Sequence, residues 1–167
     1  MEGIYDNGNF GCIGRGKFTG RKHFPRHDMK HDDLVIVNDA HWTMAFCEGD
    51  RYSAYAFYLP KYLDFFSVSN QPLKVFITSP PWNPLKGSNH CKRRTNINLS
   101  WANQLGSSVA TARSWHVFDA WSELMPIYNT TCDPAHYSCA MRRGKKKNYG
   151  GTGTIIVEGL WGFLLNI

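Results

Sequence analysis

The stretch Thr154-Ile-Ile-Val-Glu-Gly-Leu-Trp-Gly-Phe-Leu-Leu165 has the clearest pattern in this chain of 167 residues. Every second residue from Ile155 to Leu165 is apolar or glycine, and these residues share one face of an extended chain. Alternation with a period of two is typical of a β-strand that is buried on one side. The pattern therefore predicts a long strand from 154 to 165.

Shorter runs rich in β-branched and aromatic residues precede this stretch, and Asn, Asp, Gly and Pro residues separate them. They cover residues 34–37, 42–47, 52–59, 73–78, 96–101 and 107–118. In one of them, Ile97, Leu99 and Trp101 fall on the same side of an extended chain. Residues 107–118 could be a helix or a strand, and we favour a strand there. Residues 119–128 could form one or two helical turns. The spacing predicts an all-β fold, an antiparallel β-sandwich of jelly-roll type with about eight strands.

Composition indicates a folded chain with one main domain. Hydrophobic residues make up 43% of the sequence, aromatic residues 14% and charged residues 19%, which excludes disorder throughout. No apolar run reaches the roughly 18 residues that span a bilayer, and residues 1–9 lack the features of a signal peptide. We expect a soluble, non-secreted protein with a glycine-rich basic arm at 1–32 and the sandwich at 33–167.

Neither cysteine nor histidine spacing predicts a metal site or a cofactor. The five cysteines are odd in number and none lies two residues from another, which favours buried thiols over disulfides or a zinc knuckle. His23, His27 and His31 recur every four residues, but Pro25 disfavours one helix through all three. We expect no metal and no cofactor.

Positive charge is concentrated in three short segments. The net charge is +6, and 15 of the 19 lysines and arginines lie in 15–31, 86–94 and 142–147, while the remainder of the chain is acidic. Such clusters are typical of proteins that bind a polyanion, either nucleic acid or an anionic membrane. The predicted nucleic-acid-binding residues are Arg15, Lys17, Arg21, Lys22, Arg26, Lys30, Lys92, Arg93, Arg94, Arg142, Arg143, Lys145, Lys146 and Lys147.

The whole arrangement resembles the small single-jelly-roll coat proteins of simple viruses. A basic arm precedes a domain that contains Leu73-Lys-Val-Phe-Ile-Thr-Ser-Pro-Pro81 and closes on Gly153-Thr-Ile-Ile-Val-Glu-Gly-Leu-Trp161. The resemblance implies a structural protein without enzymatic activity. It would assemble with itself into a shell around viral RNA or single-stranded DNA, in the virion and, during assembly, in the host cytoplasm or nucleus.

The last predicted strand supplies the expected contact between subunits. Both of its faces stay apolar to the end of the sequence, and one sandwich core can bury only one face. We therefore expect Leu160, Trp161 and Leu164 at a subunit interface, unless the arm 1–32 covers the strand within the same chain.

Two other sandwich families compete with the coat-protein interpretation. Seven aromatic residues between Tyr52 and Phe66 could serve a lipid interface, which resembles actinoporin-like membrane-binding or pore-forming modules. Residues 133–139, Asp-Pro-Ala-His-Tyr-Ser-Cys, are similar to a late strand of immunoglobulin variable domains, although no core tryptophan follows Cys47 at the matching place.

A minor alternative concerns chemistry on nucleic acid. Ile77-Thr-Ser-Pro-Pro-Trp82 resembles the Ser-Pro-Pro-aromatic motif of amino-methyltransferases, in which backbone and side chain hold an exocyclic amine and the ring stacks on a flipped base. Residues 149–154, Tyr-Gly-Gly-Thr-Gly-Thr, are similar to the glycine loop of those enzymes, but that loop opens a helix, and here a strand is predicted. His116 and Asp119 are neighbours without a serine elbow, so no hydrolytic triad is predicted.

Overall fold

The computed structural model describes residues 34–38, 40–46, 51–67, 73–84, 95–130 and 153–167. It shows that the predicted all-β jelly-roll sandwich is wrong. Helices make up 64% of the described part, and its strands form one small parallel sheet. The chain therefore belongs to the α/β class, in which helices cover a parallel sheet.

Three strands form the sheet, in the order β1-β2-β3. They are β1 (Leu34–Val37), β2 (Leu73–Ile77) and β3 (His116–Phe118). All neighbours are parallel, with Leu34 beside Leu73 and Val75 beside His116. The predicted strands at 34–37 and 73–78 are thus confirmed, but their pairing is parallel and the sheet has no sandwich partner among the described residues.

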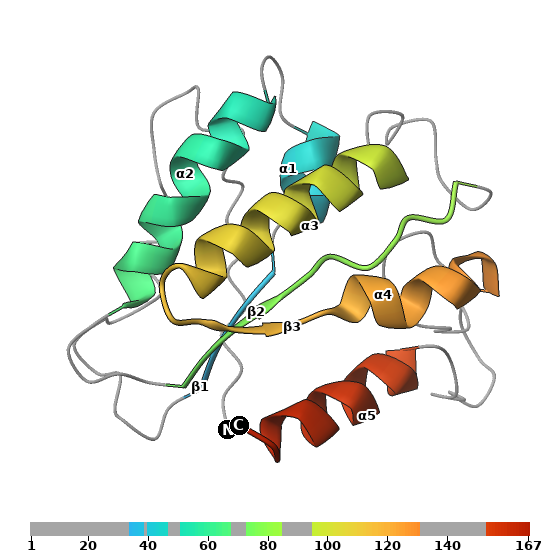
Figure 1. The fold of residues 1–167 in the computed structure, drawn as a ribbon. Coiled ribbons are helices and arrows are strands. Elements are labelled where there is room, and N and C mark those ends of the chain that lie inside the picture. Colours follow the sequence, from blue (N-terminus) through green and yellow to red (C-terminus); the bar gives the residue numbers. More distant parts are fainter. Residues whose placement is uncertain (1–33, 39, 47–50, 68–72, 85–94, 131–152) are drawn as a thin grey trace, which may run out of the picture.

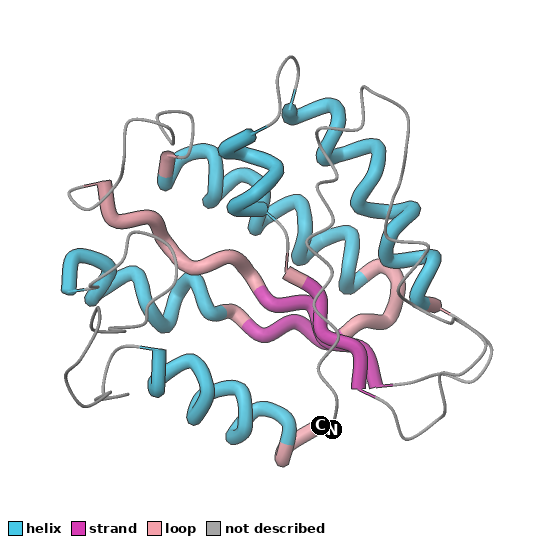
Figure 2. The backbone as a smooth tube through the Cα atoms, turned by 180° about the vertical axis from the view of Figure 1, so that it is seen from behind, coloured by secondary structure: helices cyan, strands magenta, loops and turns pink. Residues whose placement is uncertain are grey.

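Helices lie on both faces of the sheet and make a three-layer structure (Figures 1 and 2). One face carries three helices, and α5 lies against the other. The helical elements are α1 (Ala40–Phe46), α2 (Arg51–Phe66), α3 (Asn96–Thr111), α4 (Ala120–Leu124), the 3-10 helix η5 (Met125–Thr130) and α5 (Gly153–Leu164). The helical turns expected at 119–128 are confirmed as α4 and η5.

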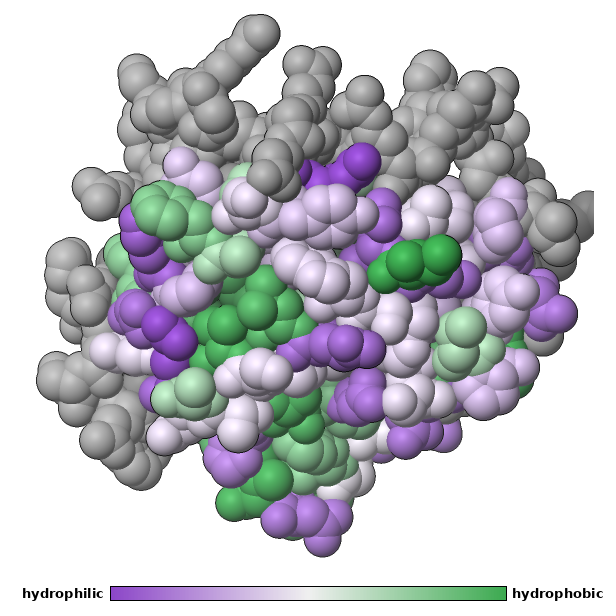
Figure 3. All heavy atoms as spheres, turned by 45° about the horizontal axis from the view of Figure 1, so that its top comes forward, coloured by the Kyte–Doolittle hydropathy of each residue, from purple (hydrophilic) through white to green (hydrophobic). Residues whose placement is uncertain are grey.

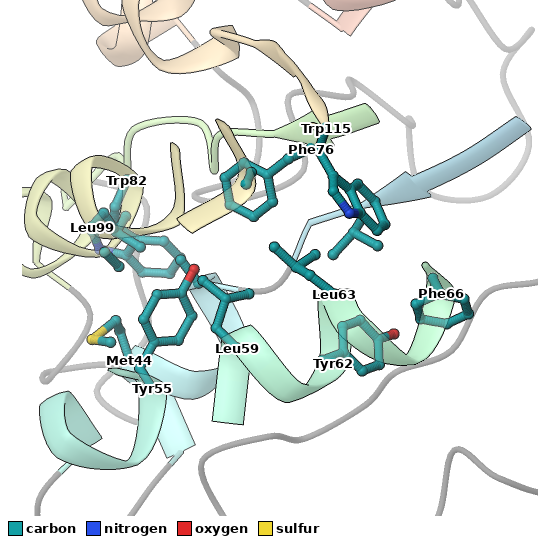
Figure 4. Close-up of a cluster of buried hydrophobic side chains, with 14 residues drawn as sticks. Met44, Tyr55, Leu59, Tyr62, Leu63, Phe66, Phe76, Trp82, Leu99 and Trp115 are labelled. Carbon is teal, nitrogen blue, oxygen red and sulfur yellow. The ribbon is translucent and has the colours of Figure 1, made fainter. Parts of the chain in front are cut away.

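Successive residues of β2 point into different cores, as the period of a strand requires. Phe76 packs with buried side chains of α2 and α3, among them Leu59, Leu63 and Leu99 (Figure 4). Val75 faces the other side of the sheet, where it packs with Phe118 and residues of α5. The sheet is therefore covered on both faces along β2.

The described part of the predicted strand at 42–47 is helix α1, the strands predicted at 52–59 and 96–101 lie in α2 and α3, and the run at 107–118 is a strand only at 116–118. In α2 and α3 the apolar residues recur with a helical period. In α2 the buried residues are Tyr55, Leu59, Tyr62, Leu63 and Phe66, which recur every three to four positions. In the predicted strand at 96–101, Ile97 is 82% exposed and Leu99 is fully buried, so the two do not share a face. Hydrophobic and hydrophilic side chains are interspersed on the outside of this helix layer (Figure 3).

The long C-terminal strand predicted from 154 to 165 is the helix α5. Leu160, Phe163 and Leu164 lie on one side of it and pack against the sheet residues Val75 and Phe118. Trp161 is 54% exposed. Leu160 and Leu164 therefore have apolar partners within the chain. The subunit contact was predicted because one apolar face of a strand had no cover, and that reason no longer applies to these two residues.

None of the helices in the described ranges is long and apolar enough to cross a bilayer.

Candidate functional site

Parallel pairing brings the carboxyl ends of all three strands to one edge of the sheet. Asn38 follows β1, the loop Thr78–Asn83 follows β2, and Asp119 follows β3. Ligands of open α/β sheets bind outside this edge. We call these residues, with His41 of α1 and Asn96 and Asn103 of α3, the carboxyl edge.

Thr78 and Asp119 join the ends of β2 and β3. The Thr78 hydroxyl donates to Asp119 Oδ1 at 2.9 Å and accepts from the Trp121 amide at 2.9 Å. Asp119 also caps α4, because its side chain accepts from the Ser122 amide at 3.3 Å and from the Ser122 hydroxyl. These bonds order the start of α4.

Helix α3 holds the loop after β2 through two asparagines. Asn103 accepts from the Ser79 amide at 2.8 Å and donates to the Ser79 carbonyl at 2.9 Å. Asn96 pairs in the same way with the amide of Trp82 at 2.6 Å and its carbonyl at 3.0 Å. The two asparagines are two helical turns apart and lie on one side of α3. Pro80 and Pro81 have no N–H, so the backbone N–H groups of Ser79 and Trp82 are the two donors between 79 and 82, and both are hydrogen-bonded.

The middle of the loop is held from α1. His41 Nε2 lies 2.7 Å from the Pro80 carbonyl oxygen, and a carbonyl only accepts, so Nε2 carries the proton. Trp82 is 5% exposed and belongs to the main core (Figure 4). Asn83 is fully buried and donates to the Asn129 carbonyl at 3.3 Å, which ties η5 to the carboxyl edge.

Asn38 and Asp119 are the exposed residues among the polar residues of the carboxyl edge, and the amide of Asn38 is held on both sides. Its Nδ2 donates to the Ile77 carbonyl at 2.9 Å, and its Oδ1 accepts from the Ser79 hydroxyl at 3.2 Å. Because the Ile77 carbonyl can only accept, the amide nitrogen must face it and the amide oxygen must face Ser79. A primary amide nitrogen carries two protons, so Asn38 keeps one for another acceptor.

The predicted nucleic-acid-binding residues all lie outside the described ranges, and so do His23, His27, His31, Asp133 and His136. The glycine segment 149–154 is described only from Gly153, where α5 begins, so it leads into a helix and not into the predicted strand. His116 and Asp119 lie at opposite ends of β3, and the structure does not bring them together. Within the described residues, no three His, Cys, Asp or Glu side chains gather in a way that could hold a metal ion.

The loop after β2 is visible in the sequence as the motif Ile77–Trp82, but the residues that organise this loop are not. Asn38, His41, Asn96 and Asn103 lie 14 to 41 positions from their partners in the loop. The one local signal was the asparagine that directly follows the apolar run Leu34-Val-Ile-Val37, because ligands of open α/β sheets bind outside the carboxyl ends of the strands.

Comparisons of the chain with protein-family models, with curated proteins and with solved structures found no match.

Proposed function

We propose that the carboxyl edge is the active site of a hydrolase that cleaves acyl esters. The observation that carries the proposal is the exposed, doubly held amide of Asn38 at the end of β1. Attack on an ester carbonyl places negative charge on its oxygen, and N–H donors that are already oriented stabilise that charge without reorganisation. The second Nδ2 proton of Asn38 suits this role.

The reaction also needs a base, and the sequence beyond η5 offers a suitable pair. Asp133 and His136 are three residues apart and lie outside the described residues, so their part in the proposal rests on the sequence alone. Imidazole is the side chain that most often moves protons near neutral pH, and a carboxylate commonly orients it. We assign His136 the role of general base and Asp133 that of its orienting partner.

The proposed steps need no nucleophilic serine. His136 takes a proton from water as the water oxygen bonds to the ester carbonyl carbon, and Asn38 donates to the resulting oxyanion. The carbon–oxygen bond to the alcohol then breaks, and the leaving oxygen takes the proton from His136. The products are a carboxylic acid and an alcohol. The expectation of no enzymatic activity, which followed from the coat-protein resemblance, differs from this proposal and stays an untested prediction.

Shell assembly stays an untested prediction. It rested on the jelly-roll architecture, which is wrong, and on an uncovered apolar strand that is the helix α5. The membrane alternative loses part of its basis as well, because Tyr55, Tyr62 and Phe66 of its aromatic cluster are buried in the core.

Two features of the fold support the amino-methyltransferase alternative, namely the parallel sheet and the helix that follows the glycine segment. The residues of the Ser-Pro-Pro-aromatic motif, which would bind the amine, argue against it. Ser79 is 1% exposed and Trp82 5% exposed, and the Pro80 carbonyl is already bonded to His41. The groups that would hold and stack a flipped base are therefore used inside the protein, which favours a structural role for this loop.

Hydrolysis of p-nitrophenyl acetate by the full chain tests the proposed function. We expect His136→Ala to lower kcat about 100-fold or more, since general-base catalysis contributes at least that factor. His116→Ala is the matched control, because His116 is exposed at the amino end of β3. Hydrolysis no faster than in buffer, or equal rates for His136→Ala and the unaltered chain, would contradict the proposal.

A further inference from the structure

We infer that Ser79 is a positioning residue of this site, which acts on the ester only through Asn38. The inference rests on the proposed function. It assigns to the Ser79 hydroxyl the task of holding the Asn38 amide in the one orientation that presents an N–H to the substrate.

The Asn38 amide needs such a partner because it is exposed. The terminal torsion of an asparagine is broad, so an exposed amide with one bond retains considerable rotational freedom. The Ile77 carbonyl fixes the nitrogen side at 2.9 Å, and the Ser79 hydroxyl fixes the oxygen side at 3.2 Å. A reversed amide would place its oxygen against the Ile77 carbonyl oxygen, where no hydrogen bond can form. Two bonds on opposite sides therefore define one orientation.

Ser79 can perform this task because it is itself held rigidly. It is 1% exposed, and Asn103 binds both its amide and its carbonyl, at 2.8 and 2.9 Å. Asn103 is 5% exposed and projects from α3, the longest described helix together with α2. Its backbone is fixed and its side chain is buried, and its hydroxyl donates to Asn38. Helix α3 therefore fixes the position of Ser79, and Ser79 in turn restrains the exposed amide of Asn38.

Thr78 provides a matched comparison within the same loop. Its hydroxyl is also buried, at 2% exposure of the residue, but it bonds to Asp119 and Trp121 on the β3 side. Removing the Thr78 hydroxyl disturbs the same loop without touching Asn38. A general effect of loop damage and a specific effect through Asn38 can therefore be separated.

The test is a double-mutant cycle on the full chain, with kcat for p-nitrophenyl acetate as the readout. We expect Ser79→Ala to lower kcat about tenfold with little change in KM, as the loss of one hydrogen bond allows. In the Asn38→Ala background, Ser79→Ala should change kcat no further, because the group through which it acts is gone. Thr78→Val should change kcat by the same factor in both backgrounds.

An equal loss of kcat for Ser79→Ala in both backgrounds would overturn the inference, and so would unchanged kcat in the single variant. Failure of the proposed function looks different, because the unaltered chain would then hydrolyse the ester no faster than buffer, or Asn38→Ala would keep full activity. If Ser79→Ala does not fold, Ser79→Cys replaces it, since a thiol is a weak donor of similar size. The same dependence on Asn38 is expected of that variant, and its absence overturns the inference equally.

Discussion

At the scale of single residues, the contact between α3 and β2 depends on a missing side chain. A Cβ atom at Gly106 would overlap the ring of Phe76, which is 1% exposed on the central strand. The ring is enclosed by the main core and cannot move aside freely. Glycine at this position therefore sets how closely α3 approaches the sheet, and with it the position of Asn103 at the carboxyl edge.

We predict that Gly106→Ala lowers the free energy of unfolding by about 1–3 kcal/mol, the usual cost of overpacking a core. Gly162→Ala is the control, because nothing lies within 4 Å of a Cβ there and the residue also belongs to a helix. The control should gain about 0.5–1 kcal/mol from the better helix propensity of alanine. Urea unfolding measures both, and equal stabilities of the two variants would contradict the close approach.

At the scale of elements, the sequence was most misleading where nearly every residue is apolar. Between 154 and 165 both a period of two and a helical period can be found, since few polar residues are present to tell them apart. Leu160, Phe163 and Leu164 have the helical spacing, and these are the residues that pack. In α2 the segment 52–59 alone was too short to reveal a helix. The helical spacing of the buried residues becomes clear only when the segment is extended to Phe66.

Helix α5 yields a prediction that separates internal packing from subunit contact. Leu164 packs against the sheet, whereas Trp161 is 54% exposed. We expect Leu164→Ser to lower the free energy of unfolding by about 2 kcal/mol or more, and Trp161→Ser to change it by about 0.5 kcal/mol or less. Thermal unfolding and particle mass by light scattering are measured together. A larger effect of Trp161→Ser, or a fall in particle mass, would instead indicate the subunit contact.

At the scale of the whole molecule, strands β1 and β2 and the helical turns after Phe118 were predictable from local sequence. The parallel order of the sheet was not, because it depends on pairing between residues about 40 positions apart, such as Leu34 with Leu73. In the candidate site, too, some features were predictable from local sequence and others depend on long-range contacts. The loop after β2 was visible as a motif, but Asn38 and Asn103 matter only through contacts that the fold creates.

The basic segment 142–147 lies in the sequence between η5 and α5, outside the described residues. We predict that replacing Arg142, Arg143, Lys145, Lys146 and Lys147 by Gln weakens the binding of single-stranded DNA. The slope of log affinity against log salt should fall in magnitude by about 0.7 for each phosphate that the variant no longer neutralises. Fluorescence anisotropy at several salt concentrations measures this, and an unchanged slope would mean that the segment binds no phosphate.

The most direct test of the proposed active site compares two asparagines in the same assay. Asn38 and Asn166 are both exposed, and each donates to a backbone carbonyl, but Asn166 follows α5, away from the carboxyl edge (Figure 1). For p-nitrophenyl acetate, Asn38→Ala should lower kcat about 100-fold or more, the usual effect of removing one oxyanion donor. Asn166→Ala should leave kcat unchanged. Equal kcat values for the two variants would contradict the assignment of the carboxyl edge as an active site.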